Sequence, residues 1–319
     1  MYTRLKHLLA ALLCLAIVPA LFACNRKGDI IEETPPVDRE VRYGLKPADP
    51  VTNQKPALTE DNYPRVDGST ANIPLMERLY SEVCGVPLDV AEGRVTASGG
   101  TGAVWNSMIE GHADLLLVYE APESFHEAIS AERLEIAPIG RDGLVFIVNT
   151  RNPVNNLTIS QLVGIYTGRI VDWKKVGESS GPIAAFQRNE DSGSQTLFLK
   201  LLMKGTKPMD PLPGFVPGQM GDLLEGVAAY DGSGGAIGYS VYYYASLMYA
   251  NPDIKILSVN GVEPSNETIQ DGTYPLTNDF YVVIRASEPD DSPARLLRDW
   301  LLTEEGSRLL TEAGYVSVR

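Results

Sequence analysis

Strand-like apolar runs alternate with amphipathic segments along most of this chain, and this alternation constrains its fold more than any other feature. We expect strands at 88–97, 113–120, 134–140, 143–149, 182–187, 235–240, 254–259 and 280–286. We expect helices at 71–83, 101–111, 158–168 and, as a pair, within 292–314. Such alternation predicts an α/β fold with largely parallel sheets. No internal repeat is visible, which excludes a solenoid.

The N-terminus is expected to be an export signal and not part of the fold. Arg4 and Lys6 precede a short apolar stretch that ends in small residues, as in a secretory signal peptide spanning 1–23. The sequence "LFAC" then resembles the lipobox of bacterial lipoproteins, which predicts lipidation of Cys24. An uncleaved membrane anchor is the alternative. In either case the folded part lies outside the cytoplasm.

A charged, proline-rich segment follows at 24–58, and we expect it to be a flexible tether. Without residues 1–24 the chain has 25 Lys and Arg against 41 Asp and Glu, a net charge of −16. Nucleic-acid binding requires a basic face, so this charge argues against it. The length of 319 residues suits two lobes better than one compact core.

Motifs of catalysis are missing from the sequence. It has no metal-ligand spacing of Cys or His, no nucleophile elbow and no P-loop. His112 lies in a turn and His126 among polar residues, where both are expected at the surface. We therefore predict no catalytic residues, no metal and no cofactor. A carboxylate pair acting as a hydrolase is the alternative, although no pair among the 41 acids is singled out.

Three polar loops of one chemical type offer a different function. Each is a turn of Gly, Ser or Thr that leads into a helix, and such turns present free N–H groups and hydroxyls to a small anion. The candidate residues are Ser69 and Thr70 in the first loop, Ser98, Gly99 and Thr101 in the second, and Arg188, Ser192, Gly193 and Ser194 in the third. Ordinary helix capping is the alternative for any single loop. Three loops, one with an arginine, favour a shared site.

Tyrosines at 239 and 242–244 provide a second candidate surface, for sugar stacking. A packed helix face is the simpler interpretation of their spacing. The "DGSGG" sequence at 231–235 is expected to be a turn before a strand.

The stretch from Gly140 to Phe198 resembles the phosphate-binding protein of bacterial phosphate ABC importers, within the type 2 periplasmic-binding-protein superfamily. The residues that fit this pattern in order are Asn149, Pro153, Leu157, Thr158, Gly168, Ile170, Trp173, Arg188, Ser192, Gly193 and Ser194. The resemblance extends over nearly all of the chain after the tether. It implies a two-lobed fold with two crossover strands and an interlobe cleft. Lobe one would comprise 59–143 and 283–319, and lobe two 144–282.

The resemblance also implies roles for the candidate residues. Arg188 would contribute a guanidinium to the anion, and the serines, threonines and glycines of the three loops would donate hydrogen bonds. In the family an aspartate after the second strand accepts the proton of phosphate. Here Glu120 is the nearest acid, displaced by one residue, and Tyr119 could take its place. A surface position for Glu120 is the alternative.

The function implied is extracytoplasmic capture of a small oxyanion, foremost inorganic phosphate, for the membrane permease of an ABC importer. The protein would be a monomer, held at the outer face of the cytoplasmic membrane by its lipid anchor alone. The alternatives are a different small ligand on the same scaffold, or a sensor or surface lipoprotein without a transport role.

Overall fold

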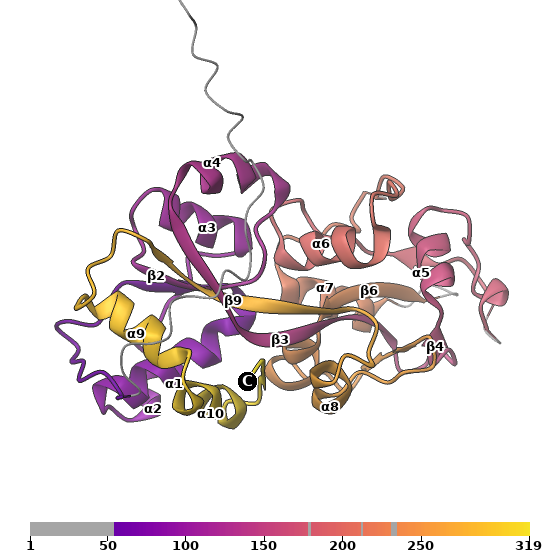
Figure 1. Ribbon diagram of the computed structural model, residues 1–319. Coiled ribbons are helices and arrows are strands. Elements are labelled where there is room, and N and C mark those ends of the chain that lie inside the picture. The colour runs from indigo at the N-terminus through magenta and orange to yellow at the C-terminus, as the bar shows by residue number, and fades with distance from the viewer. Residues whose placement is uncertain (1–53, 178–179, 212, 231–234) are drawn as a thin grey trace, which may run out of the picture. The chain divides into compact units, whose positions relative to one another are not determined.

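The computed structural model describes residues 54–177, 180–211, 213–230 and 235–319, which all belong to one compact unit (Figure 1). The expected signal peptide, Cys24, most of the tether and nearly all of the 231–235 turn lie outside the described residues. Leu58, placed by the sequence at the end of the tether, is buried and packs into the main core. In the described part of the chain no helix is long and apolar enough to cross a membrane.

One mixed sheet of eight strands organises the fold. Its strands follow the order β1 (Val66–Gly68), β2 (Leu115–Val118), β9 (Thr277–Arg285), β3 (Leu134–Asn149), β6 (Ala236–Val241) and β5 (Ala184–Ala185), with β7 (Ile254–Ile256) and β10 (Val316–Ser317) also paired to β3. Two further strands, β4 (Asn156–Leu157) and β8 (Ser258–Val259), form a small parallel pair.

The expectation of largely parallel sheets is wrong. The central strands β3 and β9 run antiparallel, and β3 is also antiparallel to β6, β7 and β10. Within the main sheet as described, only the flanking pairs β1–β2 and β5–β6 are parallel. The reason lies in the path of the chain, which leaves along β3 and returns beside it along β9, so that the middle of the sheet pairs strands of opposite direction.

The two strands expected at 134–140 and 143–149 are one continuous strand, β3. The polar residues between them are satisfied within the sheet. Arg141 donates from Nε to Oδ1 of Asp279 on β9 at 2.8 Å, and Asp142 accepts the Tyr119 hydroxyl at 2.7 Å. The first half of β3 pairs with β9, and its second half pairs with β6, so β3 joins both parts of the sheet.

Helices pack around both ends of the β3–β9 pair (Figure 1). At the β2 end lie α1 (Ile73–Cys84), α2 (Leu88–Glu92), α3 (Thr101–Ile109), α4 (His126–Ala131), α9 (Pro293–Leu301) and α10 (Glu304–Glu312). At the β6 end lie α5 (Ile159–Tyr166), α6 (Gly193–Leu197), α7 (Met220–Ala229) and α8 (Asn266–Gln270). The described chain also contains three short 3₁₀-helices and two π-helices. The 3₁₀-helices are η1 (Thr70–Asn72), η2 (Glu123–Phe125) and η3 (Trp173–Lys175), and the π-helices are η4 (Phe198–Met203) and η5 (Tyr244–Met248).

The sequence predicted most of these helices, and α5 shows why. Thr158 caps its first turn in a capping box with Gln161, and Gly168 follows its end with φ +74°. The strand expected at 88–97 is wrong, because this segment begins with α2. Leu88 and Val90 are exposed there, so their alternation with polar residues marks no buried strand face.

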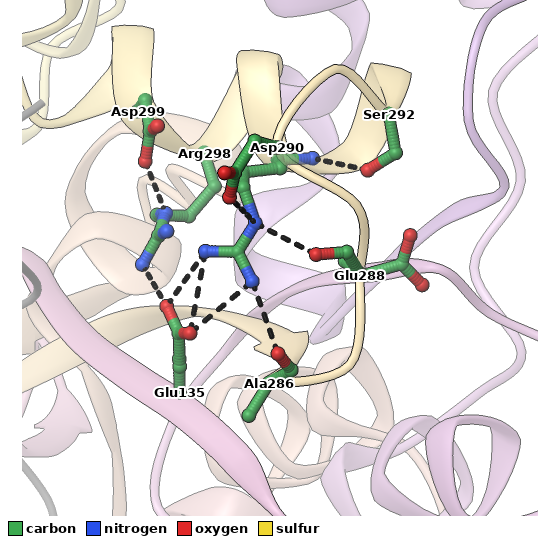
Figure 2. Close-up of polar contacts among 8 residues, drawn as sticks. Glu135, Ala286, Glu288, Asp290, Ser292, Arg298 and Asp299 are labelled. Carbon is green, nitrogen blue, oxygen red and sulfur yellow. Dashed lines mark hydrogen bonds and ion pairs between the residues drawn. The ribbon is translucent and has the colours of Figure 1, made fainter. Parts of the chain in front are cut away.

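Helix α9 is fixed to β3 by a group of ion pairs (Figure 2). Glu135 of β3 accepts hydrogen bonds from the guanidinium groups of Arg295 and Arg298, and Arg298 also contacts Asp299 at 2.6 Å. The Arg298 side chain is only 4% exposed, whereas Glu135 is 31% exposed. Glu135 is therefore the carboxylate that the two largely buried cations share, while Asp299 and Asp290 each contact one of them.

Replacing Glu135 by Ala should lower the free energy of unfolding by about 3 kcal/mol, because it removes the carboxylate shared by Arg295 and Arg298 and leaves part of their buried charge uncompensated. Thermal unfolding should show this as a fall in Tm of about 2–4 °C for each kcal/mol. Glu312→Ala is the control, since it breaks an exposed pair with Arg308 on α10 and should cost less than about 1 kcal/mol. Equal Tm values for the two variants would contradict this role of Glu135.

Candidate functional site

Three loops that are far apart in the sequence line one pocket, with an empty volume of about 380 Å³ that includes the solvent at its mouth. The lining residues are Ser69, Thr70, Ala71, Gly100, Thr101, Tyr119, Arg188, Ser192, Gly193, Ser194, Gln219, Met220 and Val241. Most of the polar ones are hydrogen-bond donors. The pocket is thus small and rich in donors, as a site for a small anion requires.

Four helical segments begin at this pocket. Their first residues are Thr70 of η1, Thr101 of α3, Gly193 of α6 and Met220 of α7, and all four line it. The N–H groups of a first helical turn have no partner within the helix, and the helix dipole adds partial positive charge there. The convergence of these starts therefore creates a region of positive potential in an acidic protein.

Arg188 is the only charged residue that the described chain places in the lining. It is 7% exposed, and its Nη2 donates to the carbonyl oxygen of Gly218 at 3.0 Å. Among the described residues, its buried Nε and Nη1 have no acceptor. Burial lowers the pKa of Arg188, but a guanidinium stays protonated in proteins. A buried cation with two unsatisfied hydrogen-bond donors favours binding of an anion.

The backbone and neighbours of Arg188 hold it in place. Its N–H donates to the Tyr239 hydroxyl at 2.9 Å, and Tyr239 also bonds to Oε1 of Gln195 on α6. Tyr239 lies on β6 and not on a helix, so the packed helix face expected around it is wrong for this residue. Its buried ring supports the site, stacked on Phe198 at 4.5 Å between centroids.

Hydroxyl groups lie in two pairs beside the pocket. The Oγ of Ser69 is 3.0 Å from Oγ1 of Thr101, and the Oγ of Ser192 is 3.0 Å from that of Ser194. All four residues are buried. A hydroxyl can rotate to donate or accept, so each of the four can redirect its hydrogen bond from the neighbouring hydroxyl to an oxygen of a bound anion.

The second and third loops touch each other across the pocket. The Gly102 N–H donates to the Asp191 carbonyl oxygen at 3.0 Å. A Cβ added to Gly193 would lie 2.4 Å from Oγ1 of Thr101, so only glycine allows this approach. The two loops are therefore in direct contact.

The structure brings together seven of the ten predicted binding residues: Ser69, Thr70, Thr101, Arg188, Ser192, Gly193 and Ser194. Three do not line the pocket. Ser98 is exposed and its N–H donates to Asp67 at 3.0 Å. Gly99 forms the turn before α3, with φ +133°. Glu120 forms an ion pair with Lys200.

Sequence reasoning missed the contribution of α7. Gln219 and Met220 line the pocket at the start of this helix, yet no binding role was assigned to them. The polar turn ahead of an apolar helix was the available signal. Nothing in the sequence indicated that this helix start would face Arg188.

Behind the pocket, Tyr119 and Asp142 form a buried pair. Burial raises the pKa of Asp142 from its ordinary 3.8 to about 6, although hydrogen bonds from Tyr119 and from backbone amides act in the opposite direction. The pKa of Tyr119 also lies well above its ordinary value, first through burial and then through the neighbouring carboxylate. Tyr119 therefore stays protonated, and its hydroxyl donates a hydrogen bond to Asp142.

No group of His, Cys, Asp or Glu suited to a metal ion occurs in the described part of the chain. His112 is exposed and His126 half-buried, and neither lines the pocket.

A family model described as "PBP superfamily domain" matches residues 53–304. The chain belongs to this superfamily. The match and the curated relatives place the chain among substrate-binding proteins and not among enzymes. The α/β fold is confirmed, and within it β3 pairs with strands of both halves of the sheet.

Two curated relatives and one solved structure illustrate the likeness. The phosphate-binding protein PstS of Bacillus subtilis is 24% identical over 258 residues, 79% of this chain and 80% of the relative. PstS of Staphylococcus epidermidis is 26% identical over 269 residues, 79% and 77% of the two chains. A putative phosphate ABC transporter substrate-binding protein of Clostridium perfringens, solved with bound phosphate, has a TM-score of 0.63 at 23% identity, covering 81% of this chain and 100% of its own.

Gly193→Ala should lower the free energy of unfolding by about 1–3 kcal/mol, because the new methyl group collides with Thr101. The urea midpoint of unfolding measures this. Gly93→Ala is the matched control, since its Cβ would meet its nearest neighbour at an ordinary 3.6 Å. A Gly193 variant as stable as this control would contradict the close contact of the two loops.

The stability of the protein should also depend on the titration of Asp142. Because the folded-state pKa is raised, the folded protein holds this proton more tightly than the unfolded chain does. Asp142 therefore favours folding at about pH 4, and this contribution, about 3 kcal/mol at most, is lost as the pH rises through about 6. Relative to Asp142→Asn, the wild type should lose stability over this interval in urea titrations. A constant difference between the two proteins would contradict the raised pKa.

Proposed function

We propose that this protein captures inorganic phosphate outside the cytoplasm and delivers it to the membrane permease of an ABC importer. The observation that carries the proposal is the buried, unpaired guanidinium edge of Arg188 in a pocket of donors. The names of the curated relatives, and the bound phosphate of the Clostridium perfringens protein, support phosphate as the anion.

The energetics allow a strong interaction. Hydrogen bonds to a charged partner contribute roughly 1.5–3 kcal/mol each. Several donors together with one arginine can offset the desolvation of a small anion and the entropy lost on association, and reach micromolar affinity, about −8 kcal/mol. The acidity of the protein as a whole matters little, because screening removes charges beyond about 8–10 Å.

The architecture supports capture by closure. In this proposal, lobe one comprises 59–143 and 283–319, lobe two comprises 144–282, and β3 and β9 connect them. Ser69 and Thr101 would bind the anion from one lobe, and Arg188 and the serines of α6 from the other. Rotation of the lobes about the two strands would open and close the site.

The remaining parts of the proposal concern location and assembly. Lipidation of Cys24 would hold the monomer at the outer face of the cytoplasmic membrane, and the charged, proline-rich segment that follows would give it reach. The support for this is the signal-like N-terminus and the lipobox resemblance.

Isothermal titration with phosphate tests the function directly. Wild-type protein should bind with micromolar or better affinity, and Arg188→Ala should lose about 3–5 kcal/mol of binding free energy, because a desolvated anion is left without its cation. Arg308→Ala is the control, since this arginine lies in exposed ion pairs on α10, and it should bind as the wild type does.

Thermal unfolding provides a second readout. Phosphate at ~100 times its Kd should stabilise the wild type by about 2.7 kcal/mol. An Arg188→Ala protein that binds phosphate as tightly as the wild type would contradict the site, and a wild type that binds no phosphate would contradict the function.

A further inference from the structure

Glu120 is the acid next to the pocket in the sequence, since it directly follows the lining residue Tyr119. It is 7% exposed, and its Oε1 accepts the hydroxyl of Tyr281 on β9 at 3.2 Å. The same oxygen is paired with the ammonium group of Lys200. The carboxylate is thus turned toward β9 and η4 and does not reach the pocket lining.

Lys200 is held in this position by a second acceptor. Its Nζ donates to Oδ1 of Asn278 on β9 at 2.8 Å. The lysine side chain is 48% exposed while that of Glu120 is 9% exposed, so the ammonium group compensates a buried carboxylate from its solvent side. Removing the lysine would leave that carboxylate buried and without its cation.

The other candidate for reading a ligand proton is also engaged. The Tyr119 hydroxyl donates to Asp142 at 2.7 Å, behind the pocket. Among the thirteen lining residues in the described chain none is Asp or Glu. Hydroxyls supply much of the remaining polar lining, and a hydroxyl can donate to a bare oxygen or accept from a protonated one.

The lack of a carboxylate among the described lining residues affects which anions the pocket can distinguish. At neutral pH phosphate carries at least one proton and sulfate carries none. A buried carboxylate that accepted the phosphate proton would face a bare oxygen of sulfate, with neither proton nor cation between them. Sites built to hydrogen-bond a hydroxyl of their substrate reject analogues that lack it by about 10⁴–10⁵.

We propose that Lys200 withdraws Glu120 from ligand recognition, so that the pocket selects tetrahedral oxyanions by charge and size and accepts sulfate as well as phosphate. This inference rests on the proposed function of the same site. It makes Lys200 a positioning residue for selectivity, although it lies outside the pocket.

Competition titration calorimetry with sodium phosphate and sodium sulfate, at pH 7.5 and constant ionic strength, tests the proposal. The wild type should bind sulfate with a Kd within about 100-fold of that for phosphate, far from the 10⁴-fold rejection expected of a proton-reading site. Binding of phosphate with sulfate rejected by about 10⁴-fold would overturn this inference alone. Binding of neither anion would overturn the proposed function and this inference with it.

Two variants locate the effect. Lys200→Met should weaken sulfate binding more than phosphate binding, by about tenfold or more, because the freed carboxylate repels an anion that has no proton to donate. Lys207→Met is the control, since Lys207 lies in the loop that follows η4, is 87% exposed and contacts Asp210 only at 3.9 Å. An unchanged phosphate-to-sulfate ratio in a folded Lys200→Met protein would overturn the proposal.

Glu120→Gln keeps the shape of the side chain and tests the proposal independently of whether the Lys200 variant folds. It should bind both anions with the wild-type ratio of affinities, since the native carboxylate does not contact the ligand. A selective gain of sulfate binding in Glu120→Gln would show that the native carboxylate reads the ligand proton, and would overturn the proposal.

Discussion

The uncompensated charge of Arg188 is the constraint on which the rest of the pocket depends. Burying a cation without a counter-ion costs several kcal/mol, and the helix starts around it add positive potential where a carboxylate would remove it. A negatively charged ligand beside Arg188 would offset this cost. Because salt screens the acidic groups that lie more than about 8–10 Å away, a protein with a negative net charge can still contain an anion-binding site.

Much of the fold could be predicted from the sequence where local signals decide the structure. The capping box at Thr158 and the helices at the C-terminus follow from patterns within a few residues. The direction of the strands could not be predicted in this way, because β3 and β9 lie more than a hundred residues apart in the sequence and their pairing depends on the path of the whole chain. Short segments such as α2 were ambiguous, since five residues carry too little periodicity to separate a helix from a strand.

In the candidate site, too, the residues set by local patterns were predicted, whereas a contact between distant segments was not. Arg188 and the serines after it were found because one continuous polar turn leads into α6. Of the three residues predicted in the second loop, Ser98, Gly99 and Thr101, only Thr101 lines the pocket, because the helix begins there. Glu120 is the instructive exception. Its partner Lys200 lies 80 residues away, and no local pattern indicates that the two meet.

The pairing of β9 with the sheet sets an order on the assembly of the protein. Strands β1 and β2 lie before residue 120, yet the strand that joins β2 to β3 spans Thr277–Arg285. A chain emerging from the ribosome therefore cannot complete its first sheet until almost its whole length has been synthesised. High contact order of this kind slows folding. The nascent polypeptide consequently stays unfolded for longer than one built from sequential hairpins would.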